Sequence, residues 1–285
     1  MPNFPIVDTH LHIWDPSKIR YSWLDGIDVL NRPYLLSDYG EHTKGVDIEA
    51  MVFVQCEADP PGYEQEAAWV AANAEADPRL KGMVAWAPLE KGAEVAADLE
   101  RLKQHRILRG IRRIIQFEPD LDFCLRPDFI EGVRTLQQFD LSFDICIDHR
   151  HMANVIAFAG KVDTVPMILD HIGKPAIKDG ALEPWRSQMF ELARMDHVIC
   201  KLSGVATEAD HGDWTADQLR PFIDTVLEAF GFDRVAFGGD WPVAVQAIAY
   251  PRWVEIVDDV LKGESEQNQR KVWRDTANRF YRLGL

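Results

Sequence analysis

Short apolar segments recur along the whole chain and alternate with longer stretches rich in Ala, Glu, Leu, Arg and Gln. The short segments have the length of strands and are apolar almost throughout, which is typical of parallel strands buried on both faces. Eight such strands are expected, at residues 6–7, 51–55, 82–86, 108–112, 142–147, 166–169, 197–202 and 234–237.

The longer stretches predict amphipathic helices, because their apolar residues recur at spacings of three and four. The clearest are residues 63–76, 92–105, 127–139, 182–195 and 215–230. Thr215 is suited to cap the last of these, and Pro127 and Pro184 suit the first turn of a helix. Eight strands alternating with helices predict an α/β fold, a (β/α)8 TIM barrel formed as a single domain by residues 1–285.

The alternative architecture is a doubly wound open sheet. No GxGxxG motif follows the first expected strand, which disfavours the dinucleotide-binding form of that fold. Residues 14–45 are the least regular part of the chain and are too long for a simple connection. We therefore expect a long loop at about residues 14–45, near the active-site mouth of the barrel.

The composition is that of an ordinary globular protein, since 47% of the 285 residues are hydrophobic and 27% are charged. Lys and Arg number 31 and Asp and Glu number 46, so the formal net charge is −15. This charge repels phosphate backbones and anionic lipids, so neither nucleic acid nor a membrane is an expected partner. The expected partner is a small molecule, and a homo-oligomer stays open.

The four cysteines form no CxxC pair, which excludes a zinc ribbon and a thioredoxin-type motif. The N-terminal residues lack the basic and apolar regions of a signal peptide. No apolar run approaches the ~20 residues that are needed to cross a bilayer. We therefore expect a protein of the reducing cytoplasm.

Candidate catalytic residues follow three of the expected strands. His10 and His12 end the first strand, and residues two apart on an extended chain point to the same side. His171 follows the sixth strand and Asp240 follows the eighth. The HxH spacing alone is a weak signal, but in a barrel these strand ends meet at one mouth. We therefore expect the four side chains to form one site, around a metal ion or a substrate oxygen.

Other strand ends supply candidate substrate contacts. Arg112 and Arg113 end the fourth strand, and neighbours in a strand face opposite ways, so one should enter the mouth and the other should brace the outer helices. A guanidinium at the mouth can hold a carboxylate or several hydroxyls through paired donors. Lys201, Gln55 and Trp14 are further expected substrate-binding residues, Trp14 through an apolar face.

The run Asp148–His151 could form a second metal site. Consecutive charged residues more often form a solvated loop, which is the favoured interpretation. The chain contains no GxSxG elbow, Walker motif, HExxH or EF-hand loop, so the sequence supports none of the corresponding chemistries.

Four separated motifs carry a family resemblance: VDTHLHIWDP, LDHIGKP, CKLSG and FGGDWPV. In this order they resemble the amidohydrolase superfamily. More narrowly, they are similar to its amidohydrolase-2 branch, which contains sugar lactonases of the L-fuconolactonase and L-rhamnonolactonase types and 2-pyrone-4,6-dicarboxylate lactonase. The resemblance spans about residues 6–281, and it implies the (β/α)8 barrel expected from the strand pattern.

The resemblance implies that the metal-ligating and catalytic residues are His10, His12, His171 and Asp240. Typical members carry a carboxylated lysine or a glutamate after strand four, where this chain has Arg112 and Arg113, which argues against two metal ions. The resemblance is compatible with one divalent ion, zinc being the expected one, and also with hydrolysis without a metal. It further favours Arg112 as the arginine that faces the mouth.

The activity that the resemblance implies is hydrolysis of a small lactone in carbohydrate catabolism, such as L-fuconolactone or L-rhamnonolactone. Asp240 would act as general base, and the three histidines would stabilise the oxyanion directly or through an ion. Two alternatives would use the same residues. One is a metal-dependent non-oxidative decarboxylase of an aromatic or dienoic acid, and the other is a sugar-acid lactone isomerase.

Overall fold

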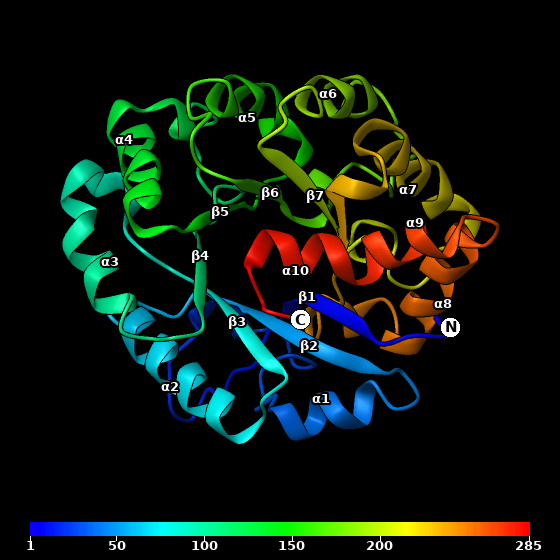
Figure 1. Cartoon of the computed structure of the whole chain (residues 1–285), viewed down its shortest axis with the longest axis horizontal. Coiled ribbons are helices and arrows are strands. Elements are labelled where there is room, and N and C mark those ends of the chain that lie inside the picture. The colour runs from blue at the N-terminus through cyan, green and yellow to red at the C-terminus, as the bar shows by residue number, and fades with distance from the viewer.

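Eight parallel strands pair in chain order to form the barrel in the computed structural model, which describes residues 1–285. The strands are β1 Ile6–Leu11, β2 Ile48–Val54, β3 Leu80–Ala85, β4 Leu108–Arg112, β5 Ser142–Ile145, β6 Met167–Leu169, β7 Val198–Leu202 and β8 Val235–Phe237. Each overlaps one of the eight expected segments, and the predicted TIM-barrel fold is confirmed (Figure 1).

Helices surround the strands. They are α1 Leu36–His42, α2 Tyr63–Ala76, α3 Ala96–Leu102, α4 Pro127–Thr135, α5 Met152–Ala159, α6 Trp185–Leu192, α7 Ala216–Phe230, α8 Tyr250–Leu261, α9 Glu266–Arg270 and α10 Thr276–Tyr281. The five expected helices correspond to α2, α3, α4, α6 and α7. Thr215 caps α7 as expected, and its backbone N–H donates to the Gln218 side chain at 2.8 Å. None of the helices is long and apolar enough to cross a membrane.

Backbone hydrogen bonds beyond the end of β8 bring the two edges of the sheet together. The His12 N–H donates to the Trp241 carbonyl at 2.7 Å, and the Asp240 N–H donates to the His10 carbonyl at 2.8 Å. The Asp8 carboxylate reinforces the junction, because it accepts from the Gly239 N–H and from the hydroxyls of two tyrosines on α1 and α8. Residues far apart in the sequence, His10 and Asp240, are thereby fixed side by side.

The apolar residues form two cores. The larger fills the space between the strands and the helices. The smaller combines inward-facing strand residues, such as Val52 and Ile168, with Ala277 and Tyr281 of α10. In Figure 1, α10 lies across the barrel, so it closes the end at which the strands begin. That end is packed shut, and the chemistry is left to the opposite end, the mouth.

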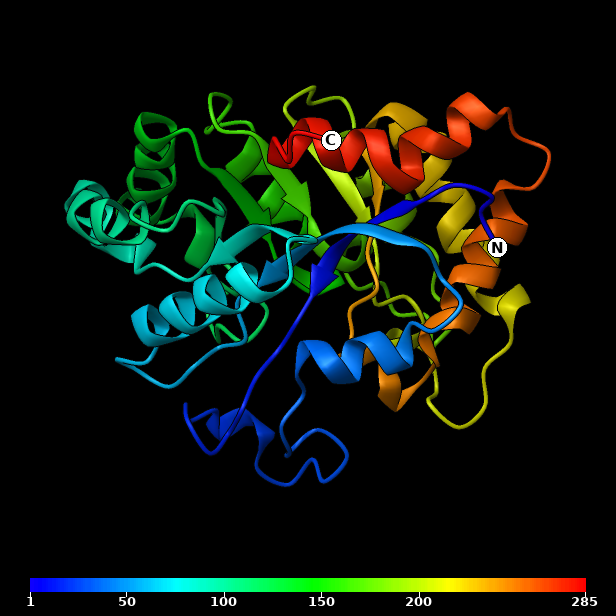
Figure 2. The same ribbon diagram turned by 60° about the horizontal axis from the view of Figure 1, so that its bottom comes forward.

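Residues 14–45 were expected to form a loop, but α1 occupies residues 36–42 of this segment. The segment lies on the mouth side of the barrel, at the opposite end from α10 (Figure 2). Trp14 pairs with Tyr34 in an isolated antiparallel bridge. The indole N–H of Trp23 donates to the Cys56 carbonyl at 2.7 Å, and the Asp59 N–H donates to the Arg20 carbonyl at 2.9 Å. The segment is thus tied to the loop that follows β2, where it forms one wall of a cavity.

Candidate active site

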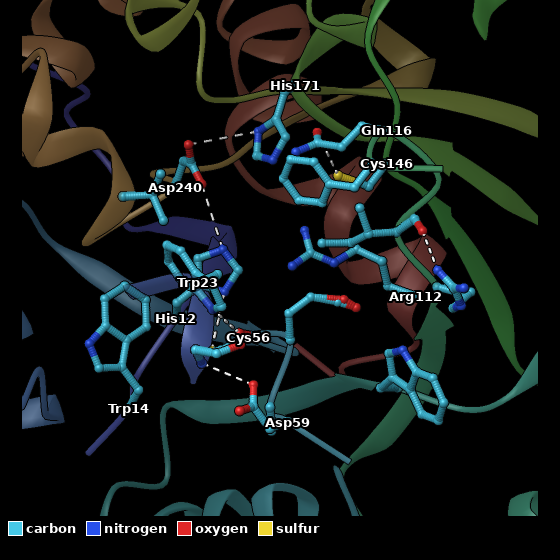
Figure 3. Close-up of a pocket in the computed structure, with 18 of the residues that line it drawn as sticks. His12, Trp14, Trp23, Cys56, Asp59, Arg112, Gln116, Cys146, His171 and Asp240 are labelled. Carbon is cyan, nitrogen blue, oxygen red and sulfur yellow. Dashed lines mark hydrogen bonds and ion pairs between the residues drawn. The ribbon is translucent and has the colours of Figure 1, made fainter. Parts of the chain in front are cut away.

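A cavity of about 560 Å³ opens at the mouth of the barrel. Its polar lining includes His12, His171 and Asp240, and three tryptophans, Trp14, Trp23 and Trp86, contribute apolar walls. Figure 3 shows Asp240 between His171 and His12, with Arg112 farther across the cavity. Cavities of this size accommodate small organic ligands.

The four residues expected from strands one, six and eight come together in this cavity and beneath it. We call His10, His12, His171 and Asp240 the histidine layer. The Nε2 atoms of His10 and His12 are 3.1 Å apart, and Asp240 Oδ1 lies 3.6 Å from His12 Nε2. The other carboxylate oxygen of Asp240 lies 3.9 Å from His171 Nδ1. One carboxylate therefore faces imidazoles from two different strands.

Unusual backbone geometry aims these side chains. His171 and Asp240 have φ angles of 52° and 54°, in the left-handed region that non-glycine residues seldom adopt. Such strained residues concentrate at functional sites because the surrounding structure has to hold them there. Gly204 leaves the space that this requires, since a Cβ at that position would lie 2.6 Å from His171 Nδ1 and 2.9 Å from Asp240 Oδ2.

Hydrogen bonds orient the rings. His12 Nδ1 lies 2.7 Å from the Val54 carbonyl, which turns its Nε2 toward Asp240. His171 Nδ1 lies 2.9 Å from the Ser203 hydroxyl. Burial lowers the pKa of all three histidines, and for His10 the nearby Lys201 lowers it further. The three imidazoles are therefore neutral at neutral pH, which leaves their lone pairs free to act as ligands or acceptors.

The histidine layer fits one divalent cation. Two overlapping groups, His10–His12–Asp240 and His10–Asp170–His171, each place three potential ligand atoms within 4.8 Å of one another. Neutral imidazoles and a carboxylate are the donors that zinc prefers. His10 Nδ1 is buried without a hydrogen-bond partner. At the end of β4, Arg112 Nη1 lies 3.3 Å from His10 Nε2. The positively charged guanidinium therefore occupies the position at which a carboxylate would be needed to hold a second metal ion.

A second group of buried charges lies beside and below the histidine layer. We call Arg112, Asp144, Asp170 and Lys201 the ion-pair layer. Lys201 Nζ is 2.8 Å from both Asp144 Oδ2 and Asp170 Oδ1, and Arg112 Nη1 is 3.2 Å from Asp170 Oδ2. The Tyr281 hydroxyl of α10 also donates to Asp144 Oδ2, at 2.6 Å.

The two carboxyls of the ion-pair layer differ electrostatically. Burial raises the pKa of Asp144, and Lys201 only partly opposes this. Burial also disfavours ionisation of Asp170, but Lys201 and Arg112 outweigh it and hold the pKa of Asp170 below its usual range. Asp170 Oδ1 lies 3.5 Å from His10 Nδ1, so this layer supports the histidine layer from below.

The expected substrate-binding residues separate into two groups. Arg112, Arg113 and Trp14 line the cavity. Lys201 does not, because its fully buried ammonium is held between two carboxylates inside the barrel. Gln55 is also buried away from the lining, where its side-chain oxygen accepts from the Glu57 N–H at 2.5 Å. These two residues contact the protein and not the space that a substrate would fill.

The two arginines differ, but the expectation that one of them braces the outer helices is wrong, because Arg113 lies beyond the end of β4 and neither of its carboxylate partners is on an α-helix. Arg112 is buried and points inward, whereas Arg113 Nη2 donates to Glu118 at 2.5 Å and its Nε lies 3.4 Å from Glu90. Both nevertheless reach the cavity wall. The Asp148–His151 run forms a turn in which Asp148 accepts from the Arg150 N–H, and it belongs to neither potential metal-ligand group.

Asp144, Asp170 and Tyr281 were not expected at the site from the sequence. A usable signal was present for the two aspartates, because each is a charged residue within or directly after an apolar strand, at an inward-facing position. Nothing local marks Tyr281, whose hydroxyl enters the barrel only because α10 packs across its closed end.

Comparison with known proteins places this geometry in a family. The amidohydrolase family model matches residues 7–283. The chain is 34% identical to L-fucono-1,5-lactonase of Burkholderia multivorans over 97% of this chain and 96% of that protein. It is 22% identical to L-rhamnono-gamma-lactonase of Scheffersomyces stipitis over 99% of this chain and all of that protein. A zinc-bound amidohydrolase structure from Burkholderia multivorans has a TM-score of 0.88 and 32% identity, and the match covers 98% of this chain and all of that one.

The fold and the site together define a (β/α)8 barrel enzyme with a histidine–aspartate centre at its strand ends. The chain belongs to the amidohydrolase family. The resemblance that was inferred from four sequence motifs is thereby confirmed.

Proposed function

We propose that this protein hydrolyses the lactone of a sugar acid, with L-fuconolactone and L-rhamnonolactone as the first substrates to test. The observation that carries the proposal is the position of Asp240, a carboxylate between His12 and His171 beside a tryptophan-walled cavity. The lactonase relatives support the same class of substrate.

In this reaction Asp240 accepts a proton from water as the water oxygen attacks the lactone carbonyl carbon. Negative charge develops on the carbonyl oxygen, to which the Arg112 guanidinium at the cavity wall can donate hydrogen bonds. The ring C–O bond then breaks, and Asp240 returns the proton to the departing alkoxide. The product is the open-chain hydroxy acid.

The metal part of the proposal is one divalent ion, expected to be zinc, held by His10, His12, His171 and Asp240 in some combination. When bound, such an ion supplies positive charge to the developing oxyanion and makes water more acidic. Asp170 Oδ1 lies 3.5 Å from the other ring nitrogen of His10, Nδ1, and would orient the ring toward such an ion. Mass spectrometry of the metal content should find no more than one equivalent per chain, and two tightly bound equivalents would contradict this.

Arg112, Arg113 and Trp14 are the proposed substrate contacts. A sugar ring presents hydroxyls at its edge and C–H groups on its faces, which match a guanidinium and an indole respectively. Trp14 is held rigidly, because its indole N–H donates to the carbonyls of Leu30 and Arg32. Lys201 and Gln55 act in this proposal as positioning residues, through Asp170 and the loop after β2.

The decisive assay is turnover of a panel of sugar-acid lactones, aromatic acids and pyrone dicarboxylates in water enriched in oxygen-18. Hydrolysis places one labelled oxygen in the product carboxylate. A lactone isomerase would release an unlabelled isomer, and a decarboxylase would release carbon dioxide from an aromatic acid. Either of those results, without lactone opening, would overturn the proposal. The cytoplasm is the compartment we propose, and the only partner proposed is the small-molecule substrate.

A further inference from the structure

The charged side chains that line the cavity differ in whether the protein places an opposite charge beside them. Three cations reach its wall, namely Arg112, Arg113 and Lys174. Their closest carboxylate partners are Asp170, Glu118 and Glu208, at N–O distances of 3.2, 2.5 and 3.8 Å respectively. Each cation therefore already faces a negative charge of the protein, and the cavity offers no unpaired cation to an anionic ligand.

Glu57 is the opposite case. Its side chain lines the cavity, yet its carboxylate accepts no hydrogen bond and forms no ion pair. Of the other lining carboxylates, Asp59 accepts from the Ser22 N–H at 2.9 Å, and Asp240 belongs to the histidine layer. Glu57 is therefore a carboxylate at the cavity wall, outside the histidine layer, that no protein donor contacts at hydrogen-bond distance.

The backbone holds Glu57 in this position. Its φ angle is 54°, in the left-handed region, and its N–H donates to the Gln55 side chain at 2.5 Å. Gln55 is in turn fixed through its own carbonyl, which accepts from Arg112 Nη2 at 2.5 Å. A strained, braced residue whose carboxylate faces a cavity is the arrangement expected where that carboxylate contacts a ligand.

The chemistry of that partner follows from the charge. A carboxylate is an acceptor only, and it forms strong, short hydrogen bonds with hydroxyl donors. Burial raises the pKa of Glu57, and Arg112, Arg113 and the Gln55 side chain only partly oppose this. A carboxylate or sulfonate on a ligand would instead meet a like charge in a partly dehydrated cavity.

We propose that Glu57 determines substrate specificity by accepting a hydrogen bond from a hydroxyl of the lactone, so that the enzyme selects neutral, hydroxyl-bearing lactones over lactones that carry an acidic substituent. This inference rests on the proposed lactonase function and specifies the chemical class of its substrate. The tryptophan walls serve the same class, since they pack against the C–H faces of an uncharged ring.

The test compares two lactones with the same ring. One is the neutral sugar lactone that the enzyme opens fastest, and the other is its counterpart with a carboxylate at the terminal carbon. The wild-type enzyme should favour the neutral lactone by about tenfold or more in kcat/KM. Glu57→Gln should raise KM for the neutral lactone by about tenfold with kcat little changed, and it should narrow the preference between the two lactones.

Glu64→Gln is the matched control, because Glu64 is an exposed residue of α2 that pairs with Arg101 outside the cavity. It removes the same charge and should leave both constants unchanged. Glu57→Gly provides a second variant, since glycine readily adopts the positive φ of this position and also removes the carboxylate. It should show the same rise in KM.

The possible results distinguish a wrong role for Glu57 from a wrong lactonase function. Opening of the carboxylated lactone as fast as the neutral one by wild type, or an unchanged KM in both Glu57 variants, overturns the role of Glu57 and leaves the lactonase function standing. Failure to open any lactone overturns both. A neutral preference that weakens in the Glu57 variants and not in Glu64→Gln supports the inference.

Discussion

The ion-pair layer and the histidine layer lie against each other inside one barrel, and both consist of buried polar side chains. In the ion-pair layer each charge has a partner, since Lys201 alone contacts two carboxylates at 2.8 Å. In the histidine layer the closest approaches of Asp240 to an imidazole are 3.6 to 3.9 Å, longer than hydrogen bonds. The charges of the first layer are paired within the protein, and the second layer keeps binding capacity for a ligand.

Because of this difference, mutations in the two layers should affect different properties, the free energy of unfolding in one layer and turnover in the other. Removing one member of a paired, buried group leaves an uncompensated charge, which lowers the free energy of unfolding. A side chain of the histidine layer has no close partner within the protein, so its removal leaves no buried charge unpaired. Such a mutation should reduce turnover and change stability little. The following predictions test whether stability and activity divide along the boundary between the layers.

The largest effect is expected in the histidine layer. Asp240→Asn should lower kcat by about 10²–10⁴-fold, the range for a lost general base, and should leave the midpoint of chemical denaturation almost unchanged. Steady-state kinetics on the best lactone and urea denaturation measure the two effects. Near-normal turnover in this variant would remove Asp240 from the role of base.

Lys201→Met should show the opposite pattern. Asp144 and Asp170 would lose the ammonium that they share, and the free energy of unfolding should fall by about 3–5 kcal/mol. Lys174→Met is the comparison, because Lys174 lies at the cavity wall with its nearest carboxylate 3.8 Å away, and it should cost less than about 1 kcal/mol. If Lys201→Met folds as stably as wild type, the ion-pair layer does not stabilise the barrel.

Glu66 extends the comparison to a buried carboxylate that lacks a cation. It lies on α2, accepts from the Cys56 N–H at 3.2 Å, and burial raises its pKa from 4.5 to about 7. The folded state therefore holds this proton more tightly than the unfolded state. The resulting stabilisation, at most about 3 kcal/mol, is complete below pH 4.5 and is lost as the pH rises through about 7.

Glu66→Gln should abolish that pH dependence, because an amide does not titrate. Urea denaturation between pH 4.5 and 8 should show wild type losing stability relative to the variant as the pH rises. The exposed neighbour Glu64 supplies a control, and Glu64→Gln should keep the wild-type slope. Parallel curves for wild type and Glu66→Gln would show that Glu66 titrates normally in the folded protein.

The smallest expected effect is the difference in kcat/KM and stability between mutants of Arg112 and of Arg113. Arg112→Met should lower kcat/KM by the equivalent of about 1.5–3 kcal/mol, as expected for lost charge-assisted hydrogen bonds. Because Arg112 also pairs with Asp170 in the ion-pair layer, this variant should lower the free energy of unfolding as well. Arg113 is engaged by Glu118 and Glu90, so Arg113→Met should change stability more than turnover. The reverse pattern in kinetics and denaturation would assign substrate contact to Arg113.

Much of this architecture was predictable because it depends on local pattern. The eight strands were recognisable since each is an apolar run, and side-chain alternation placed His10 and His12 on one face. The rule that barrel chemistry gathers at strand ends then connected His171 and Asp240 to them. The same alternation anticipated that Arg112 would point inward, although it could not specify what Arg112 would contact.

Only the tertiary structure decided which polar groups are satisfied. Lys201 was expected at the cavity and instead binds two carboxylates inside the barrel, one of them held by a tyrosine from the C-terminal helix. Glu57 differs from Asp59 because no donor reaches its carboxylate, whereas Asp59 accepts from the Ser22 N–H. Side-chain alternation is a property of a single strand and can be read from sequence. Pairing depends on the depth and register of strands that lie far apart in the chain, and these are fixed only when the barrel closes.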